Sequence, residues 1–465
     1  MVGLTLTSLG GAGTVTGSKH LLQGGGKSLL MDCGLFQGIK NLREANWRPL
    51  PVAAGSIDAV VLTHAHLDHS GYLPRLVREG FAGRIYCTPA TRAVAEIILR
   101  DSAHLQERDA DFVNKKKATR HRPALPLYDT DDVEATLPRF VTRPPHQVFS
   151  PLPGVDVTFR GAGHILGAAT VTVVWRHRED PARESGSATT VAFTGDLGRY
   201  DDPLMFDPEP IAHADVLVTE STYGDRRRET ADPMATLARI VTETVERGGT
   251  VLIPAFAVGR TQVILYYLWQ LLREGAIPEV PIYVDSPMAI NAGELLRDFP
   301  GRYRLDPART EEMFAIARYT REAEASKAIS ADRTPKIVLS ASGMATGGRI
   351  LHHLAAFAPD PRTTIVLAGY QAVGTRGRSL ADGARFLRLY GEWVPVNAHV
   401  ENPHLFSAHA DGDELIRWMG GFGAAPRRSL IVHGEPEAAA ALRLRMRREL
   451  GWEVDVAVAN RVYPL

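Results

Sequence analysis

The chain has 465 residues, which is enough for two or three domains with hydrophobic cores of their own. It is 45% hydrophobic and 23% charged, and this composition excludes a low-complexity or disordered chain. The 53 basic and 53 acidic side chains cancel, so any polyanionic partner must bind a local basic patch.

The chain also carries few signs of an extracellular or membrane-bound protein. Cys33 and Cys87 are its two cysteines, too few for a disulfide framework, and they fit a reducing compartment. The first residues, MVGLTLTSLGGAGTVTG, lack the basic start of a signal peptide, and no apolar stretch reaches membrane-spanning length without a charge. We therefore expect a cytoplasmic α/β enzyme.

Six short apolar runs along the chain have the composition of buried strands, and each ends just before a residue able to bind a metal or a proton. Parallel sheets assemble their sites at the carboxyl ends of such strands. The residues that follow the runs are Asp32, His64, His164, Asp196, Glu220 and His433. Their repeated placement predicts one site built from all six strand ends.

The middle of the chain alternates strands with helices, as in GTVLIPAFAVGRTQVILYYLWQLLREG and PKIVLSASGMATGGRILHHLAAFAP. This alternation predicts parallel βαβ units. We place an inserted domain at 225–397, between an N-terminal part at 1–224 and a C-terminal return at 398–465. Helices are expected over 101–145, and an exposed hairpin turn at 177–190.

The segment HAHLDH concentrates potential metal ligands in six positions. Neutral imidazole and carboxylate are natural zinc ligands. If the segment is a loop that begins a helix, His64 and His66 can face one ion, while Asp68 and His69 face a second. His164 and His433 could complete these sets, and Asp196 could bridge both ions. Asp32 has no obvious ion to bind, so we expect it to orient a histidine.

These motifs resemble the metallo-β-lactamase superfamily. In its β-CASP branch they are similar to bacterial and archaeal relatives of the cleavage and polyadenylation endonuclease subunit. The resemblance covers nearly the whole chain, because the motifs occur in the family's order. They are GGAGTVTGSKHLL, DCGLFQG, HAHLDH, GAGHILGAA, FTGDLGR, TESTYG, PAFAVGRTQ, SGMATGGR, FSAHAD and VHGE. The resemblance implies an αββα sandwich with an inserted β-CASP α/β domain, in which helices flank a parallel sheet.

The resemblance also implies two zinc ions per chain and assigns their ligands. One ion would be held by His64, His66, His164 and Asp196, and the other by Asp68, His69, Asp196 and His433. Asp32 is the family's first motif, while Glu220, His409 and His433 match the motifs of the β-CASP branch. Asp68, Glu220 and His409 are the catalytic residues expected beside the metals.

Two zinc ions suit the hydrolysis of a phosphodiester, since they supply hydroxide at neutral pH and stabilise charge on phosphorus. We expect His409 to protonate the departing oxygen, with Glu220 holding its other ring nitrogen. Cleavage would then leave a 5′-phosphate and a 3′-hydroxyl.

The inserted domain is expected to bind single-stranded RNA along a groove. A glycine-rich turn that enters a helix can hold a phosphate, and single arginines can contact others. The expected contacts are Arg260, Ser342, Gly343, Arg349, Arg376, Arg378 and Ser407. The basic run NKKKATRHR at 114–122 could extend the groove or be a solvated surface. A homodimer is possible.

Three other functions are alternatives to a zinc-dependent ribonuclease. A DNA nuclease of this fold lacks a histidine at the last motif, so His433 favours RNA. A catalytically silent RNA-binding subunit typically loses metal ligands, and all seven are present here. A small-molecule hydrolase such as a thioesterase or lactamase would not need the inserted domain.

Overall fold

The computed structural model describes residues 3–116, 123–177, 187–227 and 231–465. The chain divides into two compact units, which are described separately. The first comprises 1–201, 206–227 and 409–465, and the second comprises 202–205 and 228–408. The domain limits predicted at 225 and 397 lie near these divisions and stay predictions. Most of the predicted turn at 177–190 and of the basic run at 114–122 lies outside the described residues.

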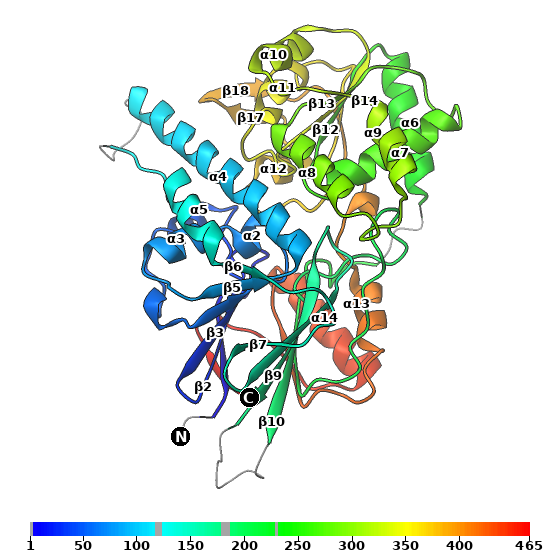
Figure 1. Ribbon diagram of the computed structural model, residues 1–465. Helices are drawn as coiled ribbons and strands as arrows, with labels where there is room; N and C mark the ends of the chain where they lie inside the picture. Colours follow the sequence, from blue (N-terminus) through cyan, green and yellow to red (C-terminus); the bar gives the residue numbers. More distant parts are fainter. Residues whose placement is uncertain (1–2, 117–122, 178–186, 228–230) are drawn as a thin grey trace. The chain divides into compact units, whose positions relative to one another are not determined.

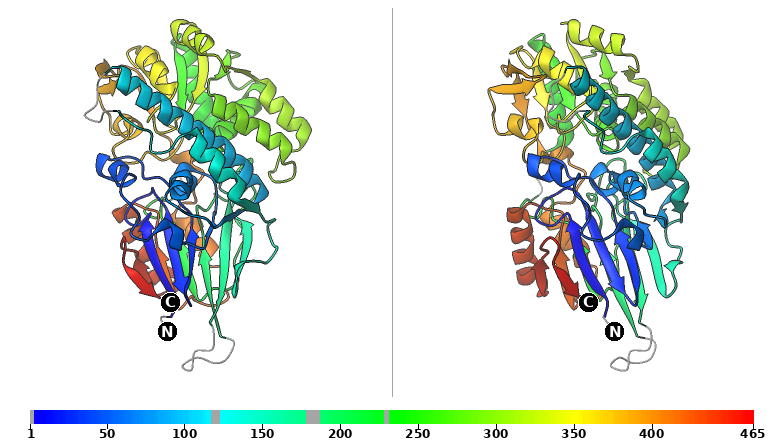
Figure 2. Two further views of the ribbon diagram at one scale, coloured as in Figure 1. Left: turned by 60° about the vertical axis from the view of Figure 1, so that its left-hand side comes forward. Right: turned by 90° about the vertical axis from the view of Figure 1, so that its left-hand side faces the viewer.

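The first unit contains two seven-stranded sheets, and the first sheet joins the two ends of the chain (Figure 1). Its strands, in spatial order, are β22 (Val462–Pro464), β1 (Thr5–Gly10), β2 (Lys19–Gly24), β3 (Lys27–Met31), β4 (Ala59–Val61), β5 (Arg84–Cys87) and β6 (Phe140–Thr142). Strands β3 to β6 are parallel, whereas β1 pairs antiparallel with β2 and β22. In Figure 2 the dark blue and dark red strands of this edge lie side by side.

The second sheet carries most of the strands that lead into the predicted site. Its spatial order is β21 (Val454–Val456), β20 (Arg428–Ile431), β11 (Val216–Thr219), β10 (Ala188–Phe193), β9 (Ala169–Arg176), β8 (Val155–Gly161) and β7 (Phe149–Leu152). Strands β10, β11, β20 and β21 are parallel, so their carboxyl ends meet at one edge. All six apolar runs predicted from the sequence are strands.

Side-chain alternation explains how the two sheets pack. In β10, Val191 and Phe193 belong to the core between the sheets, together with Leu29 and Val61 of the first sheet. Ala192, between them, points to the opposite face and packs in a separate cluster with residues of two helices. Because successive side chains of a strand point to opposite faces, the second sheet is covered on both sides.

Helices cover the outer faces of both sheets, which gives the predicted αββα layering. Those along the first sheet are α1 (Lys40–Ala45), α2 (Leu67–Ser70), α3 (Leu73–Arg78), α4 (Pro89–Lys115) and α5 (Thr130–Thr136), with short 3₁₀ turns at Ala54–Ser56 and Leu137–Arg139. Those on the second sheet are α13 (Gly412–Met419) and α14 (Pro436–Arg445), which continues as a π-helical turn, Met446–Leu450. Among the described residues, no helix has the length and apolarity needed to cross a membrane.

The prediction of helices over 101–145 is partly wrong. Helix α4 begins earlier, at Pro89, where the Thr88 side chain caps it by accepting a hydrogen bond from the Thr91 amide. Phe140–Thr142 is a strand, because the chain returns to the first sheet and pairs with β5. The single expected helical region therefore contains the end of α4, α5 and an edge strand.

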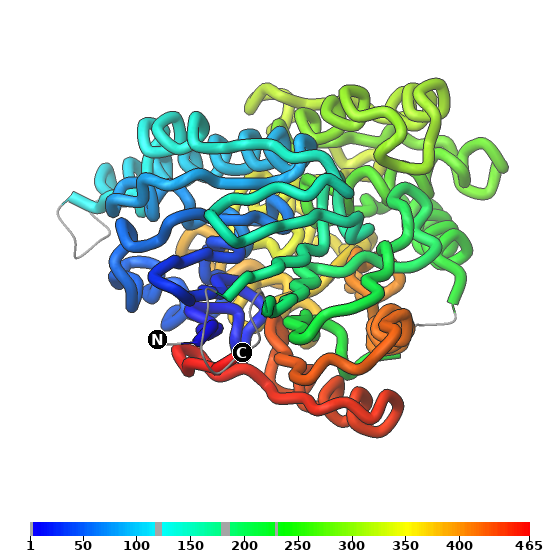
Figure 3. The backbone as a smooth tube through the Cα atoms, turned by 60° about the horizontal axis from the view of Figure 1, so that its bottom comes forward, coloured from blue at the N-terminus to red at the C-terminus, as the bar shows by residue number. Residues whose placement is uncertain are grey.

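The second unit is a parallel six-stranded sheet flanked by helices, as predicted for the insertion; it occupies the green to orange part of the tube in Figure 3. Its strands, in spatial order, are β14 (Ala317–Tyr319), β13 (Ile282–Val284), β15 (Lys336–Ser340), β12 (Thr250–Pro254), β16 (Thr364–Val366) and β19 (His399–Glu401). The helices are α6 (Pro233–Glu246), α7 (Arg260–Arg273), α8 (Pro287–Asp298), α9 (Pro307–Ala315), α10 (Ala323–Ala331), α11 (Ile350–Phe357) and α12 (Arg376–Ala381), with a 3₁₀ turn at His404–Phe406. A separate hairpin joins β17 (Phe386–Leu389) to β18 (Glu392–Pro395).

Candidate metal centre

The HAHLDH segment begins as a loop after β4 and ends in the short helix α2. His66 is the N-cap residue that directly precedes this helix. This geometry separates the ligands into two pairs. His64 and His66 lie in the loop, whereas Asp68 and His69 lie on the helix. The helix is held in place because the Ser18 amide donates to the Asp68 carbonyl (2.8 Å) and the Cys33 amide donates to the His69 carbonyl (2.6 Å).

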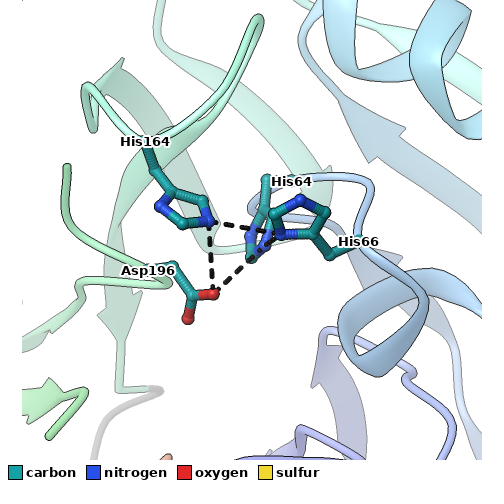
Figure 4. A group of neighbouring side chains, drawn as sticks. All are labelled: His64, His66, His164 and Asp196. Carbon is teal, nitrogen blue, oxygen red and sulfur yellow. Dashed lines mark hydrogen bonds and ion pairs between the residues drawn. The ribbon is translucent and has the colours of Figure 1, made fainter. Parts of the chain in front are cut away.

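The first group of ligand atoms consists of His64, His66, His164 and Asp196, which converge as Figure 4 shows. His66 Nδ1 lies 3.2 Å from both His64 Nε2 and His164 Nε2. Asp196 Oδ2 lies 3.3 Å from His64 Nε2 and 3.6 Å from His164 Nε2. Ligands about 2.05 Å from a tetrahedral zinc ion are themselves separated by ~3.3 Å, so these spacings fit a zinc site.

The second group consists of Asp68, His69 and His433. His69 Nε2 lies 3.2 Å from His433 Nε2, which in turn lies 3.5 Å from Asp68 Oδ2. Two adjacent residues and one distant residue thus present their ligand atoms close together. Asp68 and His69 come from α2, whereas His433 follows β20 near the end of the chain.

Asp196 faces both groups with different oxygens. Its Oδ2 faces His64 and His164, whereas its Oδ1 lies 3.2 Å from His69 Nε2 and 3.4 Å from His433 Nδ1. Oδ1 is buried and accepts no hydrogen bond from the described residues. A buried carboxylate oxygen without a donor is costly, and a cation between it and the histidines would remove that cost. The residues present therefore fit metal ions.

The electrostatics of the first group also suit metal binding, because a histidine ligand must be deprotonated. Burial lowers the pKa of His64, of His66 (to about 3) and of His164. Burial alone would raise the pKa of Asp196, but the nearby imidazoles of His433, His69 and His64 hold it well below its ordinary value. The group thus presents three neutral imidazoles and one carboxylate.

Asp32 lies within hydrogen-bonding distance of His69. Its Oδ2 accepts a hydrogen bond from His69 Nδ1 (2.8 Å), which leaves Nε2 facing the second group. The carboxylate is fixed in turn by the Thr63 amide (2.7 Å) and hydroxyl (2.8 Å). Asp32 and His433 have φ values of +58° and +47°, a region that non-glycine residues occupy rarely and that is enriched at functional sites.

Two threonines that the sequence reasoning did not select also orient histidines. Thr63 Oγ1 lies 3.1 Å from His64 Nδ1, and Thr222 Oγ1 lies 3.0 Å from His433 Nδ1. Metal-bound histidines usually donate their other ring nitrogen to such an oxygen. Their positions in the sequence could have identified these threonines, since Thr63 directly precedes His64 and Thr222 follows Glu220 by two residues.

His409 and Glu220 form a pair beside the first group. His409 Nδ1 lies 3.2 Å from Glu220 Oε2 and 3.4 Å from Oε1. Glu220 is fully buried and accepts from the amides of Leu197 (2.6 Å) and Thr222 (3.3 Å). Burial alone would lower the pKa of His409, but the Glu220, Asp196 and Asp68 carboxylates outweigh it and raise that pKa above 6.5.

Glu220 also lies close enough to Asp196 and His433 to form a third group of possible ligands. Its oxygens already accept hydrogen bonds from two amides and face His409. We therefore assign Glu220 to His409 rather than to a metal.

The predicted phosphate contacts all lie in the second unit, and one of them is placed differently from the prediction. Arg349 donates to buried Asp285 Oδ1 (2.6 Å) and to the Thr320 (2.9 Å) and Arg321 carbonyls. Its guanidinium therefore serves the interior of the unit. This corrects its assignment as a groove contact, because a phosphate would have to compete with a buried carboxylate.

The remaining predicted contacts differ in accessibility. Arg260 and Ser407 are buried, whereas Arg376 and Arg378 are partly exposed. Ser342 Oγ accepts a hydrogen bond from the Thr346 amide (3.1 Å). Gly343 lies against the Phe256 ring so closely that a side chain there would clash. The glycine-rich turn is thus a packed structure rather than a loose loop.

Family models match most of the chain. The metallo-β-lactamase superfamily model matches residues 13–236, the β-CASP domain model matches 261–380, and the model of the zinc-dependent metallo-hydrolase RNA specificity domain matches 393–457.

Similarity to individual proteins extends over most of this chain and agrees with these matches. Ribonuclease TTHA0252 of Thermus thermophilus is 36% identical, over 94% of this chain and 95% of its own length. The transcription termination factors FttA of Methanosarcina mazei and Pyrococcus abyssi are 31% and 30% identical, over 96% of this chain and 69% of theirs. A crystal structure of an Enterococcus faecalis protein of unknown function covers the whole chain with a TM-score of 0.52 at 13% identity, which shows a shared fold.

Proposed function

Because the chain belongs to the β-CASP branch of the metallo-β-lactamase superfamily, we propose that it is a zinc-dependent ribonuclease acting on single-stranded RNA. The observation that carries the proposal is the Asp196 carboxylate, whose two oxygens face two separate groups of buried ligands. A relative that is similar over almost its whole length is named a ribonuclease.

Two zinc ions are the metals we propose for these groups. One would be held by His64, His66 and His164, the other by Asp68, His69 and His433, with Asp196 shared. Ions so bound supply a hydroxide nucleophile at neutral pH and neutralise charge on the phosphate. Imidazole nitrogen and carboxylate oxygen suit zinc, whereas calcium and magnesium prefer oxygen ligands alone.

The protein's own residues would manage the proton that the leaving group needs. His409 is the donor, because its pKa is raised and Glu220 holds Nδ1, so Nε2 can carry the proton. The hydroxide oxygen would form a bond to phosphorus, the bond from phosphorus to O3′ would break, and O3′ would take the proton from His409. The proton lost when water became hydroxide would pass to solvent. The products are a 5′-phosphate and a free 3′-hydroxyl.

The ribose 2′-hydroxyl takes no part in this reaction. A metal-free ribonuclease uses that hydroxyl as the nucleophile and leaves a 2′,3′-cyclic phosphate. RNA with a 2′-deoxy substitution at the scissile nucleotide should therefore still be cut by this protein. Preference for RNA over DNA would come from binding in the second unit, where the Ser342–Gly343 turn is the proposed contact. Arg378 is paired with Asp382, and Arg376 donates to backbone carbonyls, so we propose that these two support the turn and its surroundings.

The test is incubation of zinc-loaded protein with end-labelled RNA and with DNA of the same sequence, followed by identification of the fragment termini. RNA fragments with 5′-phosphate and 3′-hydroxyl ends, together with intact DNA, are expected. A cyclic phosphate, or complete resistance of the 2′-deoxy site, would overturn the metal-assisted hydrolysis. Faster cleavage of DNA would favour the DNA nuclease of this fold.

A further inference from the structure

The hairpin formed by β17 and β18 has one buried and one exposed face. Leu387 and Leu389 point inward and join the core of the second unit. The register pairs Phe386 with Pro395 and Arg388 with Trp393, so these four residues share the outer face. Within the described residues the hairpin forms a sheet of its own.

This outer face exposes aromatic rings that a globular protein normally buries. Trp393 is 68% exposed and Phe386 is 56% exposed. The register makes them diagonal neighbours across the two strands, and such neighbours are close enough for both rings to contact one extended ligand. Adjacent exposed aromatic rings mark a binding surface more often than scattered single residues do.

The turn of the hairpin carries a third aromatic residue, Tyr390, in a backbone conformation that is unfavourable for a bulky side chain. Tyr390 and Gly391 have φ values of +50° and +92°, which a two-residue turn of this kind requires at both positions. Asparagine, aspartate or glycine is favoured at the first position, and a bulky side chain there is an outlier. The Tyr390 ring stacks on His352 of α11 with centroids 4.9 Å apart. The costly residue thus supplies an aromatic contact.

The same hairpin carries positive charge that is not neutralised by the described residues. Arg385 and Arg388 are exposed, and no described carboxylate pairs with either guanidinium. Nearby Arg378, by contrast, is held by Asp382 at 2.9 Å. Within β17 and β18, Glu392 is the single acidic residue. The surface around the rings therefore has cations available for an anionic ligand.

Arg376 links the hairpin to the glycine-rich turn. Its Nε donates to the Arg388 carbonyl (2.9 Å), and its Nη1 donates to the carbonyls of Ala345 and Thr346 (both 3.3 Å). Both structures are therefore fixed relative to each other within the second unit. A single-stranded RNA whose phosphates bind the glycine-rich turn could continue onto the hairpin.

We propose that the outer face of this hairpin is a stacking platform for the bases of a single-stranded RNA. Phe386 and Trp393 receive bases, and Arg388, which shares their face, receives a flanking phosphate. This inference rests on the proposed function, since it deepens the binding of the same substrate. Aromatic rings interleaved with arginines are typical of surfaces that bind single strands without sequence preference. Aromatic rings and arginines are also enriched at protein interfaces, so the test below includes the outcome in which this face binds a second copy.

The test measures anisotropy of a labelled oligouridine of roughly twelve nucleotides, within the usual site size for single strands. Zinc-loaded protein with His409→Ala is used to slow cleavage. Trp393→Ala should weaken binding about 5- to 150-fold, the value of one stacked base. Trp393→Phe should stay within about threefold, because a ring remains. Arg388→Ala should reduce the slope of log affinity against log salt by about 0.7, as for one phosphate contact.

Trp47→Ala, which removes an exposed tryptophan of the first unit, is the matched control and should bind as the parent does. Equal affinity of Trp393→Ala and the parent would overturn the platform. So would a concentration-dependent dimer that Trp393→Ala dissociates, because the face would then bind a second copy.

Cleavage assays separate this proposal from the proposed function. With His409 intact, Trp393→Ala should cut a long RNA with a raised KM, whereas Trp47→Ala should keep the parental KM. If the parent cuts no RNA yet Trp393→Ala loses oligouridine binding, the ribonuclease function fails and the platform stands. If the parent cuts RNA and all hairpin variants match it in binding and KM, the platform fails alone.

Discussion

At the scale of single residues, Asp196 has the largest expected effect on metal content. Its two oxygens face different ligand groups, so Asp196→Ala should weaken both sites rather than one. Elemental analysis of the purified variant is expected to find a marked loss of zinc from each site. Asp131→Ala, which removes an exposed carboxylate of α5, is the control and should retain the parental zinc content. Full retention of two tightly bound ions by the Asp196 variant would refute a bridging carboxylate.

His409 should affect rate and not metal content. His409→Ala removes the proposed proton donor, and the expected loss in rate is about 10²–10⁴-fold, the usual contribution of general acid–base catalysis. Zinc content should stay at the parental value, and exposed His104→Ala should change neither quantity. Loss of zinc along with activity would instead identify His409 as a ligand.

Glu220→Gln should act in the same direction as His409→Ala but more weakly, because it removes the partner and not the donor. The carboxylate raises the pKa of His409, so the amide variant should lose activity at a lower pH than the parent as His409 deprotonates. The measurement is the rate as a function of pH in both proteins. A parental rate and pH profile would contradict the pairing.

Lys19 contacts the segment that pairs with α2 and is expected to support the metal ligands on that helix. Its ammonium is buried, donates to the Gly17 (3.4 Å) and Gly34 carbonyls, and lies 4.6 Å and 4.8 Å from the centroids of the Phe36 and Tyr72 rings. Gly34 belongs to the segment whose backbone pairs with α2. Lys19→Met should lower the melting temperature and weaken zinc binding by Asp68 and His69.

The pH dependence distinguishes a buried charge from simple packing. Burial lowers the pKa of Lys19 from 10.5 to about 8, so the unfolded chain holds this proton more tightly than the folded one. The free energy of unfolding should therefore rise as pH increases from about 8 to 10.5, relative to Lys19→Met. Denaturant unfolding over this range measures it, with exposed Lys40→Met as the control. A constant difference across the range would contradict a buried ammonium.

At the scale of secondary-structure elements, Asp285 connects three parts of the second unit. It follows β13 and accepts hydrogen bonds from Arg349 (2.6 Å), which precedes α11, and from His353 (2.7 Å), within α11. Ser326 of α10 also donates to it. Burial alone would raise the pKa of Asp285, but these donors lower it. The buried carboxylate thus fixes the end of the glycine-rich turn that enters α11 and joins it to α10.

Asp285→Ala should destabilise the second unit by about 3–5 kcal/mol, because it leaves the Arg349 and His353 side chains without their buried partner. Hydrogen exchange should rise in β13, β15 and α11 and stay at the parental rate in β3 and β4. Asp298→Ala, at an exposed position on α8, is the control. Since the folded pKa is depressed, the contribution of Asp285 should be lost only as pH falls through that pKa, below the ordinary range. Unchanged exchange in the variant would refute the role.

At the scale of the whole molecule, the two units should respond differently to metal removal. All the proposed ligands belong to the first unit, so zinc should stabilise that unit by linkage, by about 4 kcal/mol per site at 1,000 times Kd. Chelation should increase hydrogen exchange at 59–70, 161–169 and 193–198. Exchange in β12, β15 and β16 should not change. An equal increase in both units would contradict this division.

The sequence alone determined the fold class and selected the residues that the structure groups as candidate metal ligands. The apolar runs and the residues that end them are local patterns, and a strand's side-chain alternation follows from its own sequence. His64, His164, Asp196 and His433 could thus be selected without knowing any contact. The order of the motifs then predicted the layered fold with its inserted parallel sheet.

Only the tertiary structure decided which atoms meet. Thr63 reaches His64 and Asp32, Thr222 reaches His433, and each oxygen of Asp196 turns to a different group. Arg349 has the sequence context of a phosphate contact, but Asp285, 64 positions away, takes its guanidinium. His433 meets Asp68 across 365 positions. Such partners depend on how distant strands and helices pack, and no local pattern of residues encodes that packing.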